Sequence, residues 1–394
     1  MTPLTAIILI GAIALLSSWY VYDGYLRVLR IAARGVRGMV WSSDGPPVQG
    51  VTILITAHNE GGSIEARIAN ALESCSGHSG AEVLVVSDGS TDSTAEVVRG
   101  IQDPRLRFHE TSANVGKTAA QNEGLELVEG QVVVFTDADS SFGPGFLDAV
   151  KQGFLDARVG LVDCQVLFQQ GDGKISENQS RYWRFEQSIR RIESDLGILA
   201  VASGAGLSIR RDLIQPMRDD VGEDCLLPLQ VVEQGFLVRH MKEAQVIDRM
   251  PDSTEGELRA RGRMTARNIR GTLSHRRLLN PLVHPGIAFA LWSHKLFRWL
   301  SPLWVTAIVG SGLAITGLMF GWEVAVAVFG LVIVVTWCSI RTLRASRPLP
   351  GLSVLGTFSL ANLGFAMGIV KSIRGTGPRY RNRPSPTAQA QKDR

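Results

Sequence analysis

Four long apolar stretches at the two ends of the chain constrain its fold more than any other feature of the sequence. The first, residues 3–22, carries no charged side chain, and about 20 consecutive apolar residues are enough for a helix to cross a bilayer. The other three lie near the C-terminus, at roughly 301–320, 322–340 and 352–370. The sequence therefore predicts membrane helices at both ends of the chain and a polar region, residues 48–280, between them.

Charged residues beside these stretches predict the orientation of the chain. Positive charge favours the cytoplasmic side of a membrane, and four arginines follow the first stretch: Arg27, Arg30, Arg34 and Arg37. No basic region precedes this stretch and no clear small-residue cleavage site follows it, so we expect an uncleaved anchor rather than a signal peptide. We therefore expect a multi-pass protein of a bacterial-type inner (plasma) membrane, with the polar region in the cytoplasm. The last stretch contains Asn362 and several glycines, and the sequence leaves open whether it crosses the membrane.

The expected organisation has six parts. Residues 1–24 form a transmembrane anchor, 25–50 a basic juxtamembrane linker, 51–280 an α/β domain, 281–300 an amphipathic interface helix, 301–372 a membrane region of two or three helices, and 373–394 a basic disordered tail. In the interface helix, "WSHKLFRWL" (292–300) interleaves basic and aromatic side chains, a pattern typical of helices that lie on a bilayer surface. The four cysteines are scattered and form no C-x-x-C pair, which favours buried free thiols over disulfides or a zinc site.

Alternating strand and helix patterns predict a parallel sheet in the first part of the polar region. Continuous apolar runs such as "VTILITA" (51–57) are typical of buried parallel strands, and apolar residues at helical spacing separate them. The connections between such strands are right-handed, and ligands bind at the carboxyl ends of the strands. The expected strands are 51–57, 81–88, 106–110 and 131–139, with helices over 61–75, 90–101 and 116–128.

Two common nucleotide-binding motifs are missing from these strand ends. The first strand is not followed by G-x-G-x-x-G, which disfavours a dinucleotide-binding fold. The segment "NVGKT" (114–118) ends like a phosphate-binding loop but lacks the upstream glycine, which disfavours a P-loop enzyme. With a net charge of only +4, the chain also gives no overall indication of nucleic-acid binding.

Two aspartates at the end of the fourth strand predict a metal site. Asp137 and Asp139 are close enough in the chain to repel each other, so we expect a cation between them. Mg²⁺ or Mn²⁺ is usually held by one or two carboxylates together with substrate phosphates, and stabilises a departing diphosphate as a Lewis acid. The alternative is a plain loop in which Asp137 caps a helix and Asp139 is solvated. Asp88, at the end of a neighbouring strand, favours the metal site.

An ordered series of motifs resembles the family 2 glycosyltransferases over about residues 51–300. The motifs are "TAHNE" (56–60), "VVSDGSTDST" (85–94), "NVGKTAAQNEGL" (114–125), "DADS" (137–140), "SGAGLSIRR" (203–211) and "GEDCLL" (222–227). The resemblance implies an α/β fold of the GT-A type, which has a Rossmann-like mixed sheet, here with flanking transmembrane helices. Within the family, the sequence is similar to membrane-bound bacterial polysaccharide synthases, such as poly-N-acetylglucosamine and hyaluronan synthases.

The resemblance also implies a role for each group of residues. Asp224 becomes the general base that takes the proton of the acceptor hydroxyl, with inversion at the anomeric carbon, and Glu223 orients its loop. The structural alternative is that Asp224 is only the N-cap of the helix that follows it. Asp139 becomes the ligand of Mg²⁺ or Mn²⁺, and the acceptor pocket is lined by Ser203, Gly204 and Ala205. The expected contacts of a UDP-linked sugar donor are Thr56, His58, Glu60, Asp88, Lys117, Asp137, Ala138, Arg263 and Arg267.

A basic run at 259–277 leaves the type of product open. Processive members of the family carry Q-x-x-R-W in this region, whereas this chain has "RGRMTARNIRG" (261–271). Arg263 and Arg267 can still hold phosphates because a guanidinium group matches phosphate geometry, and the run also suits contact with anionic lipid. The expected acceptor is therefore either a growing polysaccharide or a lipid-linked sugar, which includes a polyprenyl-phosphate acceptor.

Two other classes of function compete with this interpretation. Nucleotidyltransferases that make sugar nucleotides also combine an α/β sheet with acidic metal ligands. They usually begin with a Gly-rich loop that "TAHNEGGS" (56–63) lacks, and they need no membrane helices. A non-catalytic membrane scaffold would not need Asp88, Asp139 and Asp224 together. We therefore expect a hexosyltransferase whose partners are a nucleotide sugar, a glycan or lipid-linked acceptor, and the lipid bilayer.

Overall fold

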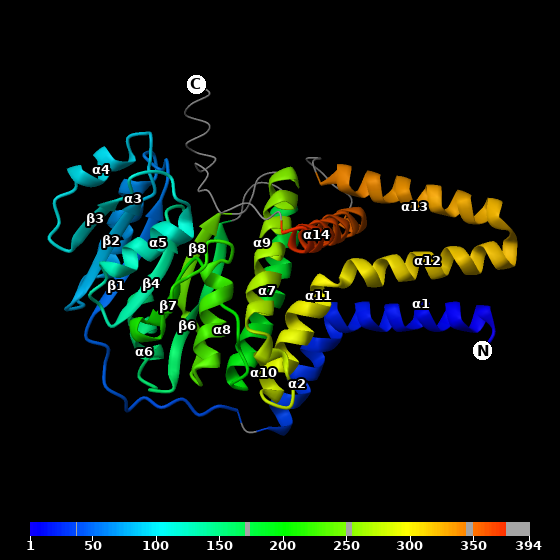
Figure 1. Cartoon of the computed structure of the whole chain (residues 1–394), viewed down its shortest axis with the longest axis horizontal. Helices are drawn as coiled ribbons and strands as arrows, with labels where there is room; N and C mark the ends of the chain where they lie inside the picture. Colours follow the sequence, from blue (N-terminus) through cyan, green and yellow to red (C-terminus); the bar gives the residue numbers. More distant parts are fainter. Residues whose placement is uncertain (37, 170–173, 250–253, 344–349, 376–394) are drawn as a thin grey trace.

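The α/β region is built on one mixed sheet of eight strands, in the order β3-β2-β1-β4-β7-β6-β8-β5. The computed structural model describes residues 1–36, 38–169, 174–249, 254–343 and 350–375. The sheet lies at one end of the molecule, and the long apolar helices project from the other (Figure 1). The prediction of an α/β fold with a mixed sheet and flanking apolar helices is confirmed.

The first half of the sheet is parallel, as the apolar runs predicted. Strand β1 pairs with β2 on one side and β4 on the other, and β2 pairs with β3. Within these pairs, Thr56 lies opposite Asp137 and Ala57 opposite Ser87, so the three strands end at the same edge of the sheet. The elements are β1 (Val51–Ala57), α3 (Ile64–Ser74), β2 (Ala81–Ser87), α4 (Thr94–Gly100), β3 (Leu106–Glu110), α5 (Lys117–Glu126) and β4 (Val132–Asp137).

The second half of the sheet reverses direction. Strand β7 runs antiparallel to both β4 and β6, while β6 and β8 are parallel. Because β7 lies beside β4, the segment just before β7 is carried to the carboxyl end of β4. The elements are β5 (Ser141–Phe142), α6 (Phe146–Gly153), β6 (Val159–Gln169), β7 (Leu207–Arg210), η2 (Arg211–Leu213), α8 (Glu223–Glu233) and β8 (Leu237–Arg249).

Successive side chains of a strand face opposite sides of the sheet, and the two sides form two separate apolar cores. Ile53 and Ile55 of β1 face the core formed with α3, α4 and α6. Leu54 of the same strand faces the core formed with α5 and α8. Burial on both faces explains why β1, β2 and β4 read as nearly continuous apolar runs in the sequence.

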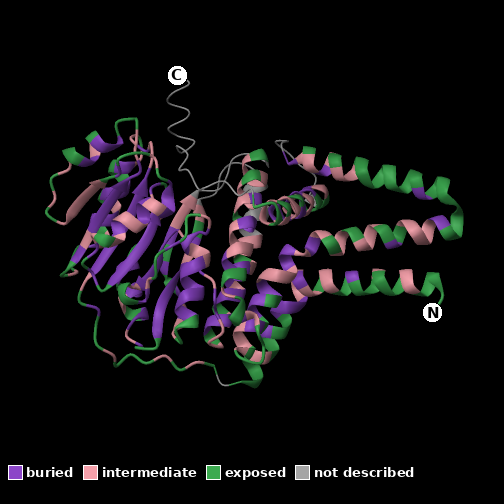
Figure 2. Ribbon diagram, in the orientation of Figure 1, coloured by how far each residue is buried: buried purple, intermediate pink, exposed green. Residues whose placement is uncertain are grey.

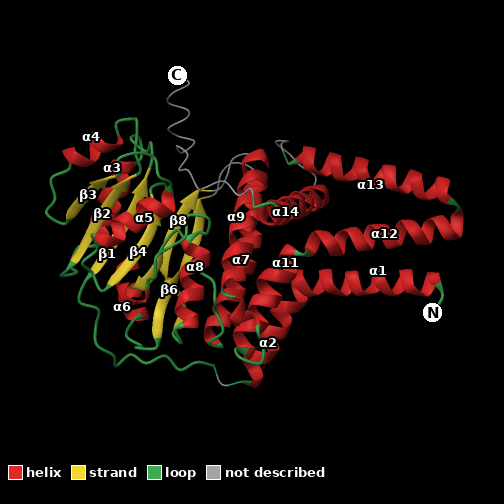
Figure 3. Cartoon of the chain, in the orientation of Figure 1, coloured by secondary structure: helices red, strands yellow, loops and turns green. Residues whose placement is uncertain are grey.

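Two long helices, α7 (Lys174–Asp195) and α9 (Thr254–Ser274), stand between the sheet and the apolar helices (Figure 3). After α9 the chain passes through η3 (Arg276–Leu279), α10 (Pro285–Ala290), the π-helical turn η4 (Leu291–Leu296) and α11 (Phe297–Trp299). Helix α7 packs on α2, and α9 packs on α8 and α14. The two helices therefore connect the sheet to the apolar helices.

Four helical segments are long and apolar enough to cross a membrane, judged by length and composition. They are the continuous helix Pro3–Gly35, α12 (Ser301–Phe320), α13 (Trp322–Thr342) and a segment of α14 (Pro350–Ile373). The first combines α1 (Pro3–Trp19), a π-helical turn η1 (Tyr20–Gly24) and α2 (Tyr25–Gly35). Their exposed residues are largely apolar, and Figure 2 shows exposed residues along most of α1 and α13, whereas half of the residues of α12 are of intermediate burial.

Helix α14 differs from the other three in direction and burial. Helices α1, α12 and α13 lie across the page in Figure 1, whereas α14 is strongly foreshortened although it has more residues than α13. It therefore crosses them at a steep angle. In the 18-residue apolar stretch of α14, 39% of the residues are buried, whereas 11% are buried in the corresponding stretch of each of the other three helices. The predicted disordered tail lies outside the described residues, which end at 375.

The predicted amphipathic segment 292–300 is helical, but its charged residues do not face outward. His294 and Arg298 are buried, and both bond to the carboxylate of Glu186 on α7, as does Lys295. His294 also bonds to Glu193 on α7 at 2.9 Å. The expectation that this basic face lies on the bilayer surface is therefore corrected, because five ionisable groups from α7, η4 and α11 form a buried cluster.

Candidate active site

A cavity of about 780 Å³ opens where the sheet meets α7, α8, α9 and α14. Its walls come from the carboxyl end of β4, the start of α5, the segment before β7 and the first turn of α8. Of the residues predicted from the sequence, ten line this cavity: Lys117, Asp137, Asp139, Ser203, Gly204, Ala205, Glu223, Asp224, Arg263 and Arg267. Motifs that are far apart in the chain therefore meet in one space.

Lys117 connects two of these motifs. Its ammonium group lies 2.6 Å from a carboxylate oxygen of Asp137 and 2.6 Å from one of Glu223. Lys117 and Glu223 are buried, whereas the carboxylate of Asp137 is partly exposed. One cation thus holds the end of β4 and the start of α8 at a fixed separation.

Glu223 and Asp224 begin helix α8, and their pKa values shift in opposite directions. Gly222 is the N-cap, so Asp224 lies inside the first turn and the N-cap alternative does not apply. Burial raises the pKa of Asp224 above its ordinary value, and the negative charge of Glu223 raises it further. The positive charges of Arg267 and Lys117 lower this pKa but do not cancel the rise. Burial also raises the pKa of Glu223, but the charges of Lys117 and Arg267 outweigh it and lower that pKa overall. Asp224 is therefore the carboxylate better suited to accept a proton.

Asp137 and Asp139 fit a hard divalent cation. Asp139 is exposed and lines the cavity, and the partly exposed carboxylate of Asp137 lies two residues away. Within the described ranges, no group of three or more His, Cys, Asp and Glu side chains could hold a metal ion. A site with one or two carboxylates suits Mg²⁺ or Mn²⁺ when substrate phosphates supply further oxygen ligands.

Arg67 of α3 lies directly behind this pair of aspartates and was missed in the sequence. It donates to the backbone oxygen of Asp137 at 3.1 Å and to the hydroxyl of Thr136 at 2.9 Å. Burial lowers its pKa to about 10, against the opposing charges of Asp137 and Asp139, so the group stays protonated at neutral pH. A signal was present in the sequence, because Arg67 falls at helical spacing with the buried residues Ile64, Ile68 and Ala71.

The predicted acceptor residues Ser203, Gly204 and Ala205 line the cavity opposite α8. The backbone N–H of Ser203 donates to Asp163 at 2.8 Å, and the carbonyl of Ala205 accepts from Thr136 at 2.7 Å. A side-chain Cβ at Gly204 would lie 3.3 Å from a carboxylate oxygen of Glu223. Glycine therefore keeps the space beside Glu223 and Asp224 open.

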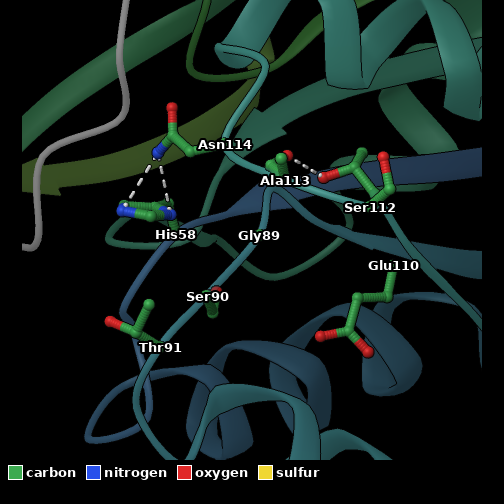
Figure 4. Close-up of a pocket in the computed structure, with 9 residues that line it drawn as sticks. His58, Gly89, Ser90, Thr91, Glu110, Ser112, Ala113 and Asn114 are labelled. Carbon is green, nitrogen blue, oxygen red and sulfur yellow. Dashed lines mark hydrogen bonds between the residues drawn. The ribbon is translucent and has the colours of Figure 1, made fainter.

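A second cavity of about 720 Å³ lies at the ends of β1, β2 and β3 (Figure 4). Its lining consists of His58, Gly89, Ser90, Thr91, Glu110, Thr111, Ser112, Ala113 and Asn114. Gly89 has a φ of 56°, and a Cβ there would lie 2.4 Å from the backbone of Ala113 and Asn114. Glycine is therefore required for the two loops to approach each other.

His58 is the predicted donor contact that lines this second cavity. Its Nδ1 lies 2.7 Å from the carbonyl oxygen of Asp88, which identifies Nδ1 as the donor. In Figure 4 the amide of Asn114 points to the His58 ring, and its nitrogen lies 3.1 Å from ring nitrogen Nε2. The loop that carries Asn114 continues into Gly116, the N-cap of α5, and then into Lys117, so the two cavities flank the same turn.

Four other predicted residues line neither cavity. The fully buried carboxylate of Asp88 accepts from the backbone N–H groups of Val115 and Gly116, at 2.7 and 3.0 Å. It thereby holds the turn before Lys117, instead of facing open space. Glu60 is buried and accepts from Ser63 at the start of α3. Thr56 and Ala138 are buried at the ends of β1 and β4.

Comparison with known proteins agrees with this arrangement. Residues 52–217 match the family model described as glycosyl transferase family 2. An N-acetylglucosaminyltransferase of Rhizobium meliloti (strain 1021) is 26% identical over 62% of this chain. That match spans 61% of the relative's own length, which is less than two thirds. An N-acetylglucosaminyltransferase of Mesorhizobium japonicum is 25% identical over 81% of this chain and 77% of its own. A poly-beta-1,6-N-acetyl-D-glucosamine synthase of Staphylococcus epidermidis is 21% identical over 69% of each chain.

A solved structure has the same fold over nearly the whole chain. The mannosyltransferase PcManGT from Pyrobaculum calidifontis, in complex with GDP-Man and Mn²⁺, aligns with a TM-score of 0.68 and 20% sequence identity. The alignment covers 92% of this chain and 99% of the mannosyltransferase. This likeness confirms the predicted GT-A-type fold. Residues 52–217 are therefore the part of this chain that matches glycosyl transferase family 2, and motif residues of this part lie around the larger cavity.

Proposed function

We propose that the chain is an inverting glycosyltransferase that moves a sugar of the N-acetylglucosamine type from a UDP-linked donor to a saccharide acceptor. The observation that carries the proposal is the convergence of Lys117, Asp139, Glu223 and Asp224 on one cavity. The named functions of the two rhizobial relatives and of the staphylococcal synthase support the choice of sugar. The acceptor is a growing polysaccharide or a lipid-linked sugar.

In this proposal the donor extends across both cavities. The nucleoside lies in the smaller cavity, against His58 and the loop that Asp88 holds, and the diphosphate passes Lys117 into the larger one. Asp139, with Asp137, holds Mg²⁺ or Mn²⁺, which when bound neutralises charge on the diphosphate. Arg263 and Arg267 of α9 line the same cavity and suit phosphate oxygens.

Asp224 acts as the general base in the transfer step. Its carboxylate accepts the proton of the acceptor hydroxyl while the oxygen forms a bond to the anomeric carbon. The bond from that carbon to the diphosphate breaks on the opposite face, and the diphosphate leaves with the electron pair, which inverts the anomeric configuration. Glu223, bonded to Lys117, fixes the first turn of α8 so that the carboxylate of Asp224 faces the substrate.

We also propose that the chain crosses an inner membrane and that its catalytic domain is cytoplasmic. The four apolar helices support membrane insertion, and the arginines that follow the first stretch support this orientation. Nucleotide sugars are water-soluble donors, so a cytoplasmic active site beside the membrane gives them direct access.

A panel of donors tests the proposed function. Purified protein in lipid should transfer sugar from UDP-N-acetylglucosamine in the presence of Mn²⁺, and chelation of the metal should abolish transfer. Asp224→Asn should retain donor binding and lose transfer by about 10²–10⁴-fold, because only the proton acceptor is removed. Unchanged transfer by Asp224→Asn would exclude Asp224 as the base.

A further inference from the structure

The larger cavity has two ends of different chemistry. The end at the sheet carries the carboxylates of Asp139 and Asp224. The part of the wall formed by α7, α11 and α14 includes the charged groups of Glu186 and Arg298, and Arg261 of α9 lies over the rings of Tyr182 and Phe365. The aromatic and apolar side chains of this part are Tyr182, Trp183, Trp299, Phe358, Ala361 and Phe365. Three of these six residues, Phe358, Ala361 and Phe365, belong to α14, the apolar helix that packs on α9. The catalytic carboxylates and an apolar helix thus share one continuous space.

The wall formed by α14 reaches the outer surface of the molecule. Val354 lines the cavity and is 54% exposed, and Met264 on α9 lines it and is 51% exposed. Both side chains are apolar. These exposed apolar groups suit contact with lipid better than with water, while Glu257 and Arg261 of α9 add charged groups to the same cavity wall.

The direction of α14 differs from that of the other apolar helices. Helices α1, α12 and α13 all extend away from the sheet in Figure 1 and have the lengths that cross a bilayer, so we take their common direction as the direction across it. Helix α14 crosses them steeply, beside the sheet-facing ends of α12 and α13, and therefore lies along the membrane. A hydrocarbon chain in the adjacent leaflet can reach Val354 and Phe358 without leaving the lipid.

The described part of the chain offers no enclosed polar route across the membrane. In the 18-residue apolar stretches of Pro3–Gly35, α12 and α13, only 11% of the residues are buried. The exposed side chains of these helices are mainly apolar. A saccharide chain that crossed between these helices would need polar partners for its hydroxyl groups. This favours an acceptor that remains on the side of the membrane where the catalytic residues lie.

We infer that the acceptor is a saccharide attached to a membrane lipid, which enters the cavity along the face of α14 that carries Val354, Phe358, Ala361 and Phe365. Its terminal sugar reaches Asp224, and its hydrocarbon chain stays in the bilayer along α14. The acceptor hydroxyl forms the new bond to the anomeric carbon, its proton goes to Asp224 and the nucleotide diphosphate leaves. This inference rests on the proposed function and selects the lipid-linked acceptor from its two alternatives.

A matched pair of variants on α14 tests the route. Ala361 lines the cavity, whereas Leu363, two residues away, does not line it and is 48% exposed. The full chain is placed in phosphatidylethanolamine–phosphatidylglycerol vesicles with UDP-N-acetylglucosamine and Mn²⁺. Two acceptors are compared, a polyprenyl-linked N-acetylglucosamine and a water-soluble oligosaccharide of the same sugar. Donor binding is measured separately by titration.

The lipid-linked acceptor should be used at least about tenfold more efficiently than the soluble one. Ala361→Trp should lose transfer to the lipid-linked acceptor while it keeps donor binding, and Leu363→Trp should behave as the unaltered protein. If Ala361→Trp fails to bind donor, Ala361→Leu replaces it in the same comparison. Equal use of both acceptors, growth of the soluble oligosaccharide into a long polymer, or full transfer by the Ala361 variant would overturn the inference. Absence of transfer to either acceptor, with donor still bound, would instead contradict the proposed function.

Discussion

Lys117 has a structural role that its sequence motif does not indicate. Its ammonium group contacts Asp137 and Glu223 at 2.6 Å each, so two carboxylates from distant motifs share one cation. Removal of either carboxylate therefore changes the electrostatic surroundings of the other. The electrostatic surroundings of Asp224 also depend on its neighbours, because its pKa responds to burial and to the charges of Glu223, Arg267 and Lys117.

This coupling predicts opposite pH shifts for two variants. The proposed base must be ionised, so the rate falls as the pH falls through the pKa of Asp224. Glu223→Gln removes a negative charge that raises this pKa, so the acid limb of the pH–rate profile should move to lower pH. Arg267→Gln removes a positive charge that lowers it, so the acid limb should move to higher pH. Shifts in the same direction for both variants would contradict the assignment of Asp224.

Arg67 should control metal binding without contact to the metal. It donates to the backbone of Asp137, to Thr136 and to Asn70, and so fixes the loop that carries Asp139. Arg67→Met should weaken Mn²⁺ binding by about tenfold, at the lower end of the effect seen for groups that orient metal ligands. Electron paramagnetic resonance of free Mn²⁺ measures this directly in the presence of UDP.

A surface arginine provides the control for Arg67. Arg218 forms an exposed ion pair with Asp220, and Arg218→Gln should leave Mn²⁺ binding unchanged because exposed pairs contribute little. Equal Mn²⁺ affinity in Arg67→Met and the unaltered protein would show that the loop keeps its shape without Arg67.

The motifs in the sequence identified the residues that face the larger cavity better than those that support it. Asp139, Asp224 and Lys117 lie next to glycine-rich or strand-end segments with a recognisable spacing. Arg67 and Glu186 have no such signature, because their roles depend on partners 69 to 112 positions away in the chain. The roles of all these residues in donor, metal and acceptor binding stay predictions.

At the scale of elements, small residues set the contact between α14 and α9. A Cβ at Gly368 would lie 2.5 Å from Cβ of Thr265, which no real side chain tolerates without a shift. Gly351, on the same helix, has no atom within 4 Å of its Cβ position. The two glycines therefore form a matched pair for testing how much α14 contributes to stability.

Gly368→Leu should destabilise the protein by about 1–3 kcal/mol because it overpacks this contact. Gly351→Leu makes the same chemical change in open space and should stay within about 0.5 kcal/mol of the unaltered protein. The unfolding midpoint in detergent, with the same buffer and protein concentration, compares them. Equal midpoints for the two variants would mean that α14 does not pack tightly on α9.

Periodicity predicted the first strands and helices because both faces of that half of the sheet are buried. It did not predict that β7 would lie between β4 and β6, since that order depends on antiparallel pairings between distant segments. It also placed the basic residues of 292–300 at a lipid surface, because a buried cluster around Glu186 looks like an exposed charged face in the sequence.

For the whole molecule, the sequence predicted an α/β region and apolar helices, which the structure has. It did not decide whether the last apolar stretch, residues 352–370, crosses the membrane. Composition cannot distinguish a helix that crosses a bilayer from one that lies along it, since both need an apolar surface. The direction of α14 relative to α12 and α13 supports the proposal that α14 lies along the bilayer, and α14 packs against α9.

The central claim is that Asp139 and Asp224 serve one reaction in one cavity. The most direct test is a structure of the full chain with UDP-N-acetylglucosamine and Mn²⁺, in which anomalous scattering locates the metal. The metal should lie beside Asp139 in contact with the diphosphate, with the anomeric carbon between it and Asp224. A metal bound elsewhere, or a sugar that lies away from Asp224, would contradict the claim.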